Sequence, residues 1–325
     1  MESPHNEPLL SNDSTSSPSG NGNYTSDIHT FIKIMKLQNL ISRGVYVYSV
    51  FGLVGLLMGI FILITYIRNF SKKSKFEKLD IFIFTVTVAD FMLILFSLTD
   101  IVRPNPVMMS ALCCAILSFS FNLPYFYTEY IHVVISFFLV SNHIAVARRA
   151  LSKPPFTILA VMGLSILWSA LITALIGVSD DLNKELNCYL DPFDAPAKYS
   201  IVKFVFGFLI PTLIILGSIL HFLIHSTCMQ SSNNLQACRE SFYPHRIFLA
   251  LVTVTFICRL VYNVLLLLRR EAVDDYSHRE KELIVIIGEL TMFVGSCLCL
   301  VSIVALDEKM KHAVRETSSC FTKPC

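Results

Sequence analysis

The segment TFICRLVYNVLLLL, residues 255–268, places one arginine, Arg259, inside a long apolar run. A guanidinium at that depth in a membrane costs several kcal/mol unless it is paired with an opposite charge or hydrated. Three more ionisable side chains, Asp90, Glu129 and His132, also lie in apolar runs. Such a set can form buried ion pairs, or it can carry protons across a membrane.

The composition indicates a membrane protein. Apolar residues make up 54% of the 325 residues and charged residues 15%, against roughly 25% charged residues in a soluble domain. Nucleotide-binding and metalloprotease motifs are absent from the sequence, so we expect no enzyme, no cofactor and no metal site. No basic face with interleaved aromatic residues suggests binding to nucleic acid.

A membrane-spanning helix needs about 20 mostly apolar residues. Seven stretches meet this length, so the sequence predicts an all-α membrane protein with a seven-transmembrane-helix bundle over residues 44–306. We expect a disordered tail at residues 1–43 and a short amphipathic helix and tail at residues 307–325. The predicted spans are Gly44–Arg68, Leu79–Ile101, Met108–Val146, Phe156–Val178, Ser200–His225, Ile247–Leu268 and Leu283–Leu306.

The distribution of Lys and Arg favours an N-terminus outside the cell, because the inner loops then hold the larger share of these residues. In this orientation the sequons at Asn12 and Asn23 lie outside, where they can be glycosylated. The acidic loop DDLNKELNCYLDP, residues 180–192, also lies outside in this orientation.

Four stretches resemble the rhodopsin-like (class A) G-protein-coupled receptors over residues 44–320. LDIFIFTVTVADFMLILFSL is similar to the second helix of that family, with Asp90 at its buried acid. WSALITALIG carries Trp168, FGFLIPTLII carries Pro211, and FICRLVYNVLLLL retains Phe256, Cys258, Tyr262 and Asn263. The resemblance implies a plasma-membrane receptor that binds an extracellular ligand and engages a heterotrimeric G protein, an arrestin or both.

Within this family the chain looks most like the chemokine-receptor branch. ELTMFVGSCLCL at residues 289–300 is similar to the seventh helix of that branch, which places a ligand-contacting glutamate at Glu289. The resemblance implies a basic peptide or small protein, such as a chemokine, as ligand, with Glu129, Arg259 and Tyr262 also lining its pocket. The acidic outer loop would attract such a ligand over long range.

The sequence departs from the family at the residues that switch these receptors. The Asp-Arg-Tyr motif of the third helix reads Asn142-His143-Ile144, and Cys299 to Ile303 replaces Asn-Pro-x-x-Tyr in the seventh helix. The tryptophan of the sixth helix is Arg259. We therefore expect G-protein coupling that is altered, constitutive or lost, as in scavenging receptors.

The resemblance also suggests partners for the buried charges. Glu129 lies about four helical turns before His143 on the inward face, which predicts an ion pair with Arg259; the alternative is a hydrated Arg259 in an open cavity. His132 would face Asp90 and hydrogen-bond to it; the alternative is a bare, protonated Asp90.

Three cysteine assignments follow from the family pattern. A disulfide bond is expected from Cys114, or from Cys113, to Cys188 in the acidic loop. Cys320 and Cys325 follow the last span and are expected to be palmitoylated.

The sequence also allows an alternative function from another class of protein. In this alternative the chain is a seven-span transporter or lipid scramblase that uses the set of Arg259, Glu129, His132 and Asp90.

Overall fold

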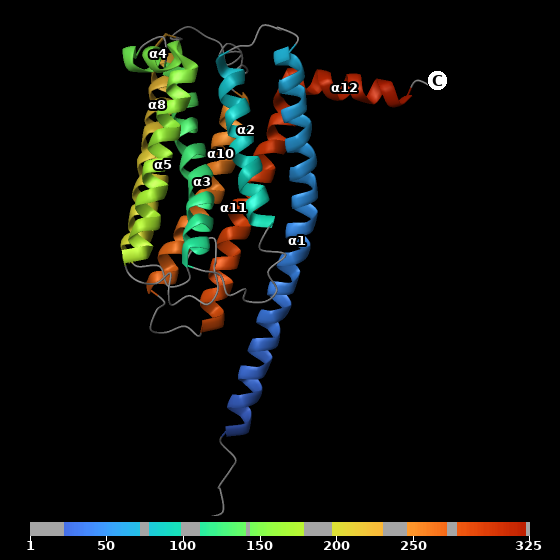
Figure 1. Cartoon of the computed structure of the whole chain (residues 1–325), viewed down its shortest axis with the longest axis vertical. Coiled ribbons are helices and arrows are strands. Elements are labelled where there is room, and N and C mark those ends of the chain that lie inside the picture. Colours follow the sequence, from blue (N-terminus) through green and yellow to red (C-terminus); the bar gives the residue numbers. More distant parts are fainter. Residues whose placement is uncertain are drawn as a thin grey trace, which may run out of the picture. The chain divides into compact units, whose positions relative to one another are not determined.

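The computed structural model describes residues 23–71, 78–98, 111–140, 144–178, 197–229, 246–271 and 278–322, and every regular element among them is a helix (Figure 1). Seven of these described helical segments are long and apolar enough to cross a membrane, which confirms the predicted fold class. The elements are α1 (Asn23–Ser71), α2 (Lys78–Leu98), α3 (Ala111–Val140), α4 (Ala145–Ser152), α5 (Pro154–Val178), α7 (Ala197–Phe204), the π-helix η1 (Val205–Leu209), α8 (Ile210–Met229), α10 (Arg246–Glu271), α11 (His278–Leu306) and α12 (Glu308–Thr322).

Two boundaries differ from the sequence prediction. Helix α1 begins at Asn23 and not near Gly44, and residues 28–42 contain no glycine or proline that would break the helix between these points. The expectation of a disordered tail up to residue 43 is therefore wrong for the part of the tail that forms the start of α1. The third span does not run to Val146, since α3 ends at Val140 and a separate helix, α4, begins at Ala145.

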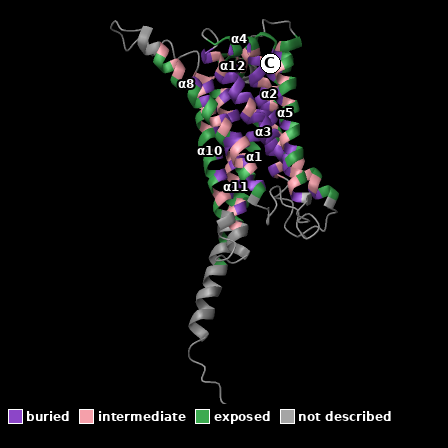
Figure 2. Cartoon of the chain, turned by 90° about the vertical axis from the view of Figure 1, so that its left-hand side faces the viewer, coloured by how far each residue is buried: buried purple, intermediate pink, exposed green. Residues whose placement is uncertain are grey.

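The chain divides into two compact units, residues 1–40 and residues 41–325, and the second unit holds the seven spans. Within it, α3 is the central helix: it contacts α2, α5 and α8, and 78% of its span is buried against 22% of the α5 span. Buried residues line the inward faces of the bundle, and exposed residues follow the outer faces of α8 and α10 (Figure 2). Apolar side chains on the outer faces of the helices are what the hydrocarbon core of a lipid bilayer requires.

A glycine brings α1 close to the rest of this unit. A Cβ on Gly55 would lie 2.7 Å from the Cys297 sulfur of α11 and 2.9 Å from the Ile94 side chain of α2. Small residues let membrane helices approach closely, and van der Waals packing then holds them together. Gly55 therefore fixes α1 against both α2 and α11.

The fifth span contains a π-helical turn that the sequence did not predict. In η1 the N–H of Ile210 donates to the Val205 carbonyl, five residues back. In the same pattern the Phe206 carbonyl would accept a hydrogen bond from the backbone N–H of Pro211. Proline has no backbone N–H, so this bond cannot form. Tyr130 of α3 donates its hydroxyl to the Phe206 carbonyl at 2.9 Å. The widened turn is thus satisfied from a neighbouring helix.

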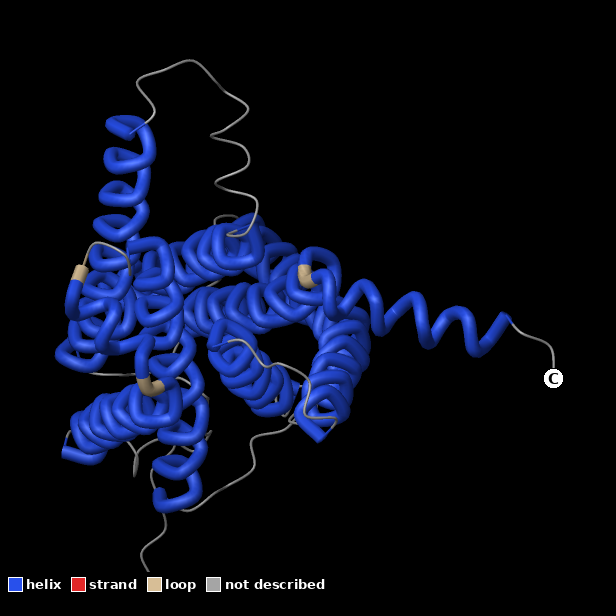
Figure 3. The backbone as a smooth tube through the Cα atoms, turned by 90° about the horizontal axis from the view of Figure 1, so that it is seen from above, coloured by secondary structure: helices blue, strands red, loops and turns tan. Residues whose placement is uncertain are grey.

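The amphipathic helix expected after the seventh span is α12, which runs away from the bundle (Figure 3). Asp307 begins it, because its carboxylate accepts a hydrogen bond from the Lys309 N–H at 2.8 Å, as an N-cap residue does. Met310 in the first turn is fully buried in the core formed by α1, α2, α10 and α11. The start of α12 is therefore anchored in the bundle.

Candidate functional site

The predicted ion pair is present at the centre of the bundle. The Arg259 Nε lies 3.1 Å from the Glu129 Oε1, and both side chains are 4% exposed. The N–H is not aligned with Oε1, which has no hydrogen-bond partner by angle. We therefore describe this contact as a charge pair and not as an aligned hydrogen bond. Opposite charges so close offset part of the cost of burying each one.

Tyr125 joins the ion pair to a second cation. The Arg259 guanidinium carbon lies 3.9 Å from the centre of the Tyr125 ring, and the Lys203 ammonium lies 4.8 Å from it. The Asn263 amide donates to the Tyr125 hydroxyl at 3.1 Å. Gly207 of η1 makes room for this ring, since a Cβ there would lie 2.5 Å from it. The π-turn and its glycine thus position Tyr125 between two cations.

Lys203 of α7 is fully buried and sits among aromatic rings. Its ammonium lies 4.8–5.5 Å from the ring centres of four aromatic residues and donates to the Tyr199 hydroxyl at 3.3 Å. Aromatic faces attract a cation. Sequence reasoning missed Lys203, because this lysine lies near the start of its span, where a lysine side chain usually reaches the membrane surface. The rings belong to Phe121, Tyr125, Tyr199 and Tyr262.

Two more residues expected at the ligand pocket border this cluster. Tyr262 is 2% exposed and its ring centre lies 5.8 Å from that of Tyr125. Glu289 is 4% exposed on α11. It lies three residues before Met292, which packs in the same core cluster as Tyr262. One region among α3, α7 and α10 therefore collects two cations, the Glu129 carboxylate and a group of tyrosines, and Glu289 is buried on α11 one turn from Met292 of the same core cluster.

The predicted hydrogen bond between His132 and Asp90 is wrong. Neither ring nitrogen of His132 has a hydrogen-bond partner among the described residues, and the Asp90 Oδ2 has none there either. Ser136, one turn after His132, contacts Ser218 of α8 through its hydroxyl at 3.3 Å. This face of α3 points to α8 and away from α2, because residues four apart share a helix face.

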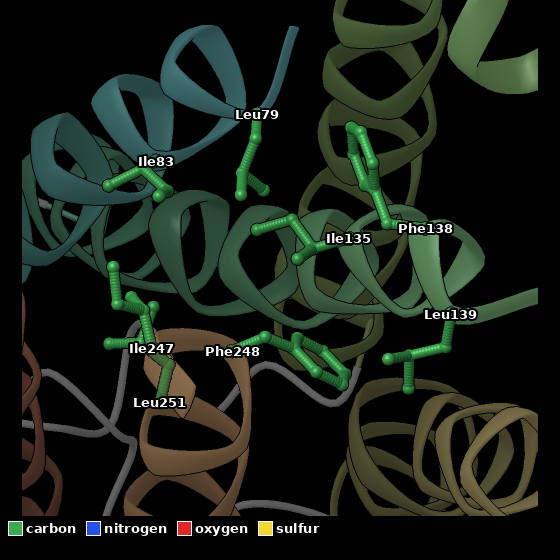
Figure 4. A pocket seen from close by; sticks show the side chains of 8 residues that line it. All are labelled: Leu79, Ile83, Ile135, Phe138, Leu139, Ile247, Phe248 and Leu251. Carbon is green, nitrogen blue, oxygen red and sulfur yellow. The ribbon is translucent and has the colours of Figure 1, made fainter. Parts of the chain in front are cut away.

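The end of the bundle that carries α4 and α12 is tightly packed in the described structure. A cavity of only about 20 Å³ lies between α2, α3 and α10, enough for about one water molecule. Figure 4 shows its eight apolar side chains, among them Ile135, Leu139 and Phe248. The described side chains therefore fill most of the space between α3 and α10 at this end.

The two α11 residues predicted to take part in switching are part of the apolar core. Cys299 is 2% exposed, and its sulfur lies 3.5 Å from the Thr255 hydroxyl of α10. Ile303 is fully buried in the cluster formed by α1, α2, α10 and α11. Ile144, just before α4, is 37% exposed. Asn142 and His143 lie outside the described residues.

Charged residues at this same end join α12 to the bundle. Arg246, the first residue of α10, donates to the Leu306 carbonyl at 2.9 Å and pairs with Glu308. Lys309 pairs with Asp80 of α2 at 2.5 Å. In addition, the Tyr66 hydroxyl of α1 donates to Asp307 at 3.2 Å. The first turn of α12 therefore holds α1, α2 and α10.

The cysteine and glycosylation assignments are only partly covered by the structure. Of the two cysteines considered at the start of α3, Cys114 is the one that is disulfide-bonded. Its predicted partner, Cys188, lies outside the described residues, as do Asn12 and Cys325. Asn23 and Cys320 lie at the described ends of α1 and α12, but the structure does not describe their side chains.

Comparison with known proteins bears on the whole arrangement. The family model described as 7 transmembrane receptor (rhodopsin family) matches residues 58–302, which is most of the chain and all seven spans in part or whole. No individual curated protein matches the sequence. With seven membrane-length helices and this match, the chain belongs to the rhodopsin family of seven-transmembrane receptors.

Proposed function

We propose that this receptor binds an extracellular peptide or small protein, of the kind that chemokine receptors bind, at the plasma membrane with its N-terminus outside. The observation that carries the proposal is the buried cluster around Tyr125. It offers cations at Lys203 and Arg259 and carboxylates at Glu129 and Glu289. A peptide end carries both charges and apolar side chains, so it can engage such a mixed site.

In this proposal Glu289 receives a basic group of the ligand, and Tyr262 contributes apolar contact. The pair of Arg259 with Glu129 forms the floor of the site. The transporter or scramblase alternative uses some of the same charges, but membership in a receptor family does not favour it.

Binding of basic chemokines tests the ligand class. We expect saturable binding of a fluorescent chemokine panel to cells, weakened about tenfold or more by Glu289→Gln, since a hydrogen bond to a charged group contributes about 1.5–3 kcal/mol. Glu316→Gln, on the exposed face of α12, is the matched control and should bind as the wild type does. Absence of chemokine binding, or equal binding by Glu289→Gln, would refute the proposed ligand class.

We further propose that coupling to the G protein is altered by His143, which stands where the family has arginine. The test is basal G-protein dissociation in cells for wild type and His143→Arg at matched surface expression. Activity in the wild type indicates constitutive coupling. Silence in the wild type with activity in the variant indicates an intact receptor that has lost coupling, as a scavenger would. Equal silence in both would contradict a decisive role for His143.

A further inference from the structure

A larger cavity, of about 160 Å³, lies between α3, α8 and α10. Glu129 and His132 of α3 line its inner wall, and Leu216 of α8 and Phe256 of α10 are also among its lining residues. It is separate from the aromatic cluster around Lys203, although Glu129 takes part in both. The proposed receptor function makes no use of this cavity.

The inner wall carries hydrogen-bonding atoms without protein partners. His132 is 1% exposed, and neither of its ring nitrogens is hydrogen-bonded among the described residues. The Glu129 Oε1 also lacks an aligned hydrogen bond. A buried polar group without a partner is costly. A neutral histidine has one donor and one acceptor nitrogen, so a group that both donates and accepts would satisfy this wall best.

The cavity opens toward the membrane. Leu216 is 50% exposed and Phe256 is 37% exposed, and both lie within membrane-length spans. Exposed apolar side chains at that depth contact lipid hydrocarbon. A molecule dissolved in the bilayer can therefore reach His132 between α8 and α10 without passing through water.

Charge and size narrow the chemistry of the occupant. Arg259 already balances Glu129, so a charged head group would leave a net charge in the bundle, which is expensive. A hydroxyl is neutral and both donates and accepts. An engineered cavity of about 150 Å³ binds benzene, so this one has room for a hydroxyl and about six carbon atoms. The rest of a lipid chain must then remain in the bilayer.

We propose that this cavity binds the hydroxyl head group of a neutral membrane amphiphile, with His132 and Glu129 as its hydrogen-bonding partners and the apolar part leaving past Leu216 and Phe256. Long-chain alcohols and sterols both present this head group. Because Glu129 also pairs with Arg259, an occupant that takes a hydrogen bond to Glu129 acts directly on the ion pair at the centre of the bundle.

Photolabelling of the full-length receptor in phosphatidylcholine nanodiscs tests this proposal. The probes are a diazirine-bearing hexadecanol, its methyl ether, and a diazirine-bearing sterol. We expect saturable labelling of α8 and α10 near residues 212–219 and 252–256 by the alcohol or the sterol. The ether should label about tenfold less, because it has lost its hydrogen-bond donor.

Two variants separate recognition of the head group from access. His132→Phe keeps an aromatic ring but removes both unpartnered nitrogens, so labelling should fall about tenfold. Leu216→Trp should block the mouth and abolish labelling. Leu213→Trp is the matched control, since Leu213 is 59% exposed on the same helix but does not line the cavity; its labelling should equal that of the wild type.

Each outcome decides the question. Labelling by the sterol alone supports the proposal and identifies a sterol as the kind of occupant. Labelling by the alcohol alone also supports it and identifies a long-chain alcohol. Where the alcohol labels the receptor, equally strong labelling by its ether overturns the role of the hydroxyl, and absence of labelling by both the alcohol and the sterol overturns the proposal. Equal labelling of Leu216→Trp and Leu213→Trp, or unchanged labelling of His132→Phe, overturns the site.

Discussion

Removing one partner of the Arg259–Glu129 pair should destabilise the receptor more than removing both. At 3.1 Å between Nε and Oε1, Coulomb's law with an effective dielectric constant of about 20 gives an attraction of about 5 kcal/mol. Breaking a buried pair by deleting one charge costs about 3–5 kcal/mol, because the other charge is left buried alone. Arg259→Met also loses the contact with the Tyr125 ring, about 0.5–2 kcal/mol more.

The assay is thermal unfolding of the purified receptor for the two single variants and the double variant Glu129→Gln/Arg259→Met. We expect each single variant to unfold at least about 5 °C below the wild type, and the double variant to unfold above the less stable single variant. The exposed pair of His312 and Glu316, at 3.5 Å, is the control, since Glu316→Gln should cost less than about 1 kcal/mol. A double variant that is as unstable as the sum of the singles would refute the pairing.

Three further predictions concern other parts of the bundle. Tyr130→Phe leaves the Phe206 carbonyl without a donor, so the free energy of unfolding should fall by about 1–3 kcal/mol in thermal unfolding. Arg246→Ala removes the contacts with the Leu306 carbonyl and Glu308, so hydrogen exchange should become faster in the first turns of α10. Hydrogen bonds from Arg246 and Lys311 lower the pKa of Glu308. The contact with Arg246 should therefore persist from neutral pH down to about pH 5 and weaken only as the pH falls through the lowered pKa, which is measured by the same hydrogen exchange.

Matched variants control these three measurements. Tyr46→Phe removes a hydroxyl from a side chain that is 71% exposed and should leave stability unchanged; an equal loss would count against the role of Tyr130. Arg315→Ala removes an exposed cation from α12. If this variant also showed faster exchange in α10, the specific role of the Arg246 contacts would be contradicted. Faster exchange in α10 already between pH 7 and about pH 6 would contradict the lowered pKa of Glu308.

The spans and the central ion pair could be predicted because each follows from a simple physical demand. An apolar run of membrane length must form a helix that satisfies its own backbone. An arginine within such a run needs an anion or water, and Glu129 was the acid on the inward face of the neighbouring central helix. The structure agrees with both predictions.

Lys203 and His132 show where this reasoning fails. Lys203 lies near the start of its span, where a lysine side chain usually extends to the membrane surface, and only the positions of rings from four different turns reveal that it points inward. The error at His132 came from assigning its face by analogy with a related helix. A change of one residue rotates a side chain by about 100° around the helix, so a partner inferred in this way fails with a small error in alignment.

The π-turn could not be predicted from its own segment at all. Pro211 indicates only that a carbonyl in the preceding turn lacks an N–H. Whether the helix bends, breaks or widens depends on which donor is nearby, and that donor is Tyr130 of α3. Gly207 likewise has a role only once the Tyr125 ring lies against it. The local sequence shows only that a backbone donor is missing, whereas the packing of α3 against η1 determines which side chain replaces it.

The charges at the α12 end suggest how this chain can hold its resting state without the arginine of the third helix. In the proposed orientation this end is cytoplasmic, and opening it requires α10 to part from α3 around the small apolar cavity. Arg246 opposes that movement through the Leu306 carbonyl and Glu308, and Lys309 fixes the same turn to Asp80. At this end the ionic restraint therefore joins α10 to α12, whereas the Arg259–Glu129 pair joins α10 to α3 at the centre of the bundle. We therefore expect a ligand that opens this end to release α10 from α12, which would make the position of α12 part of the proposed switch.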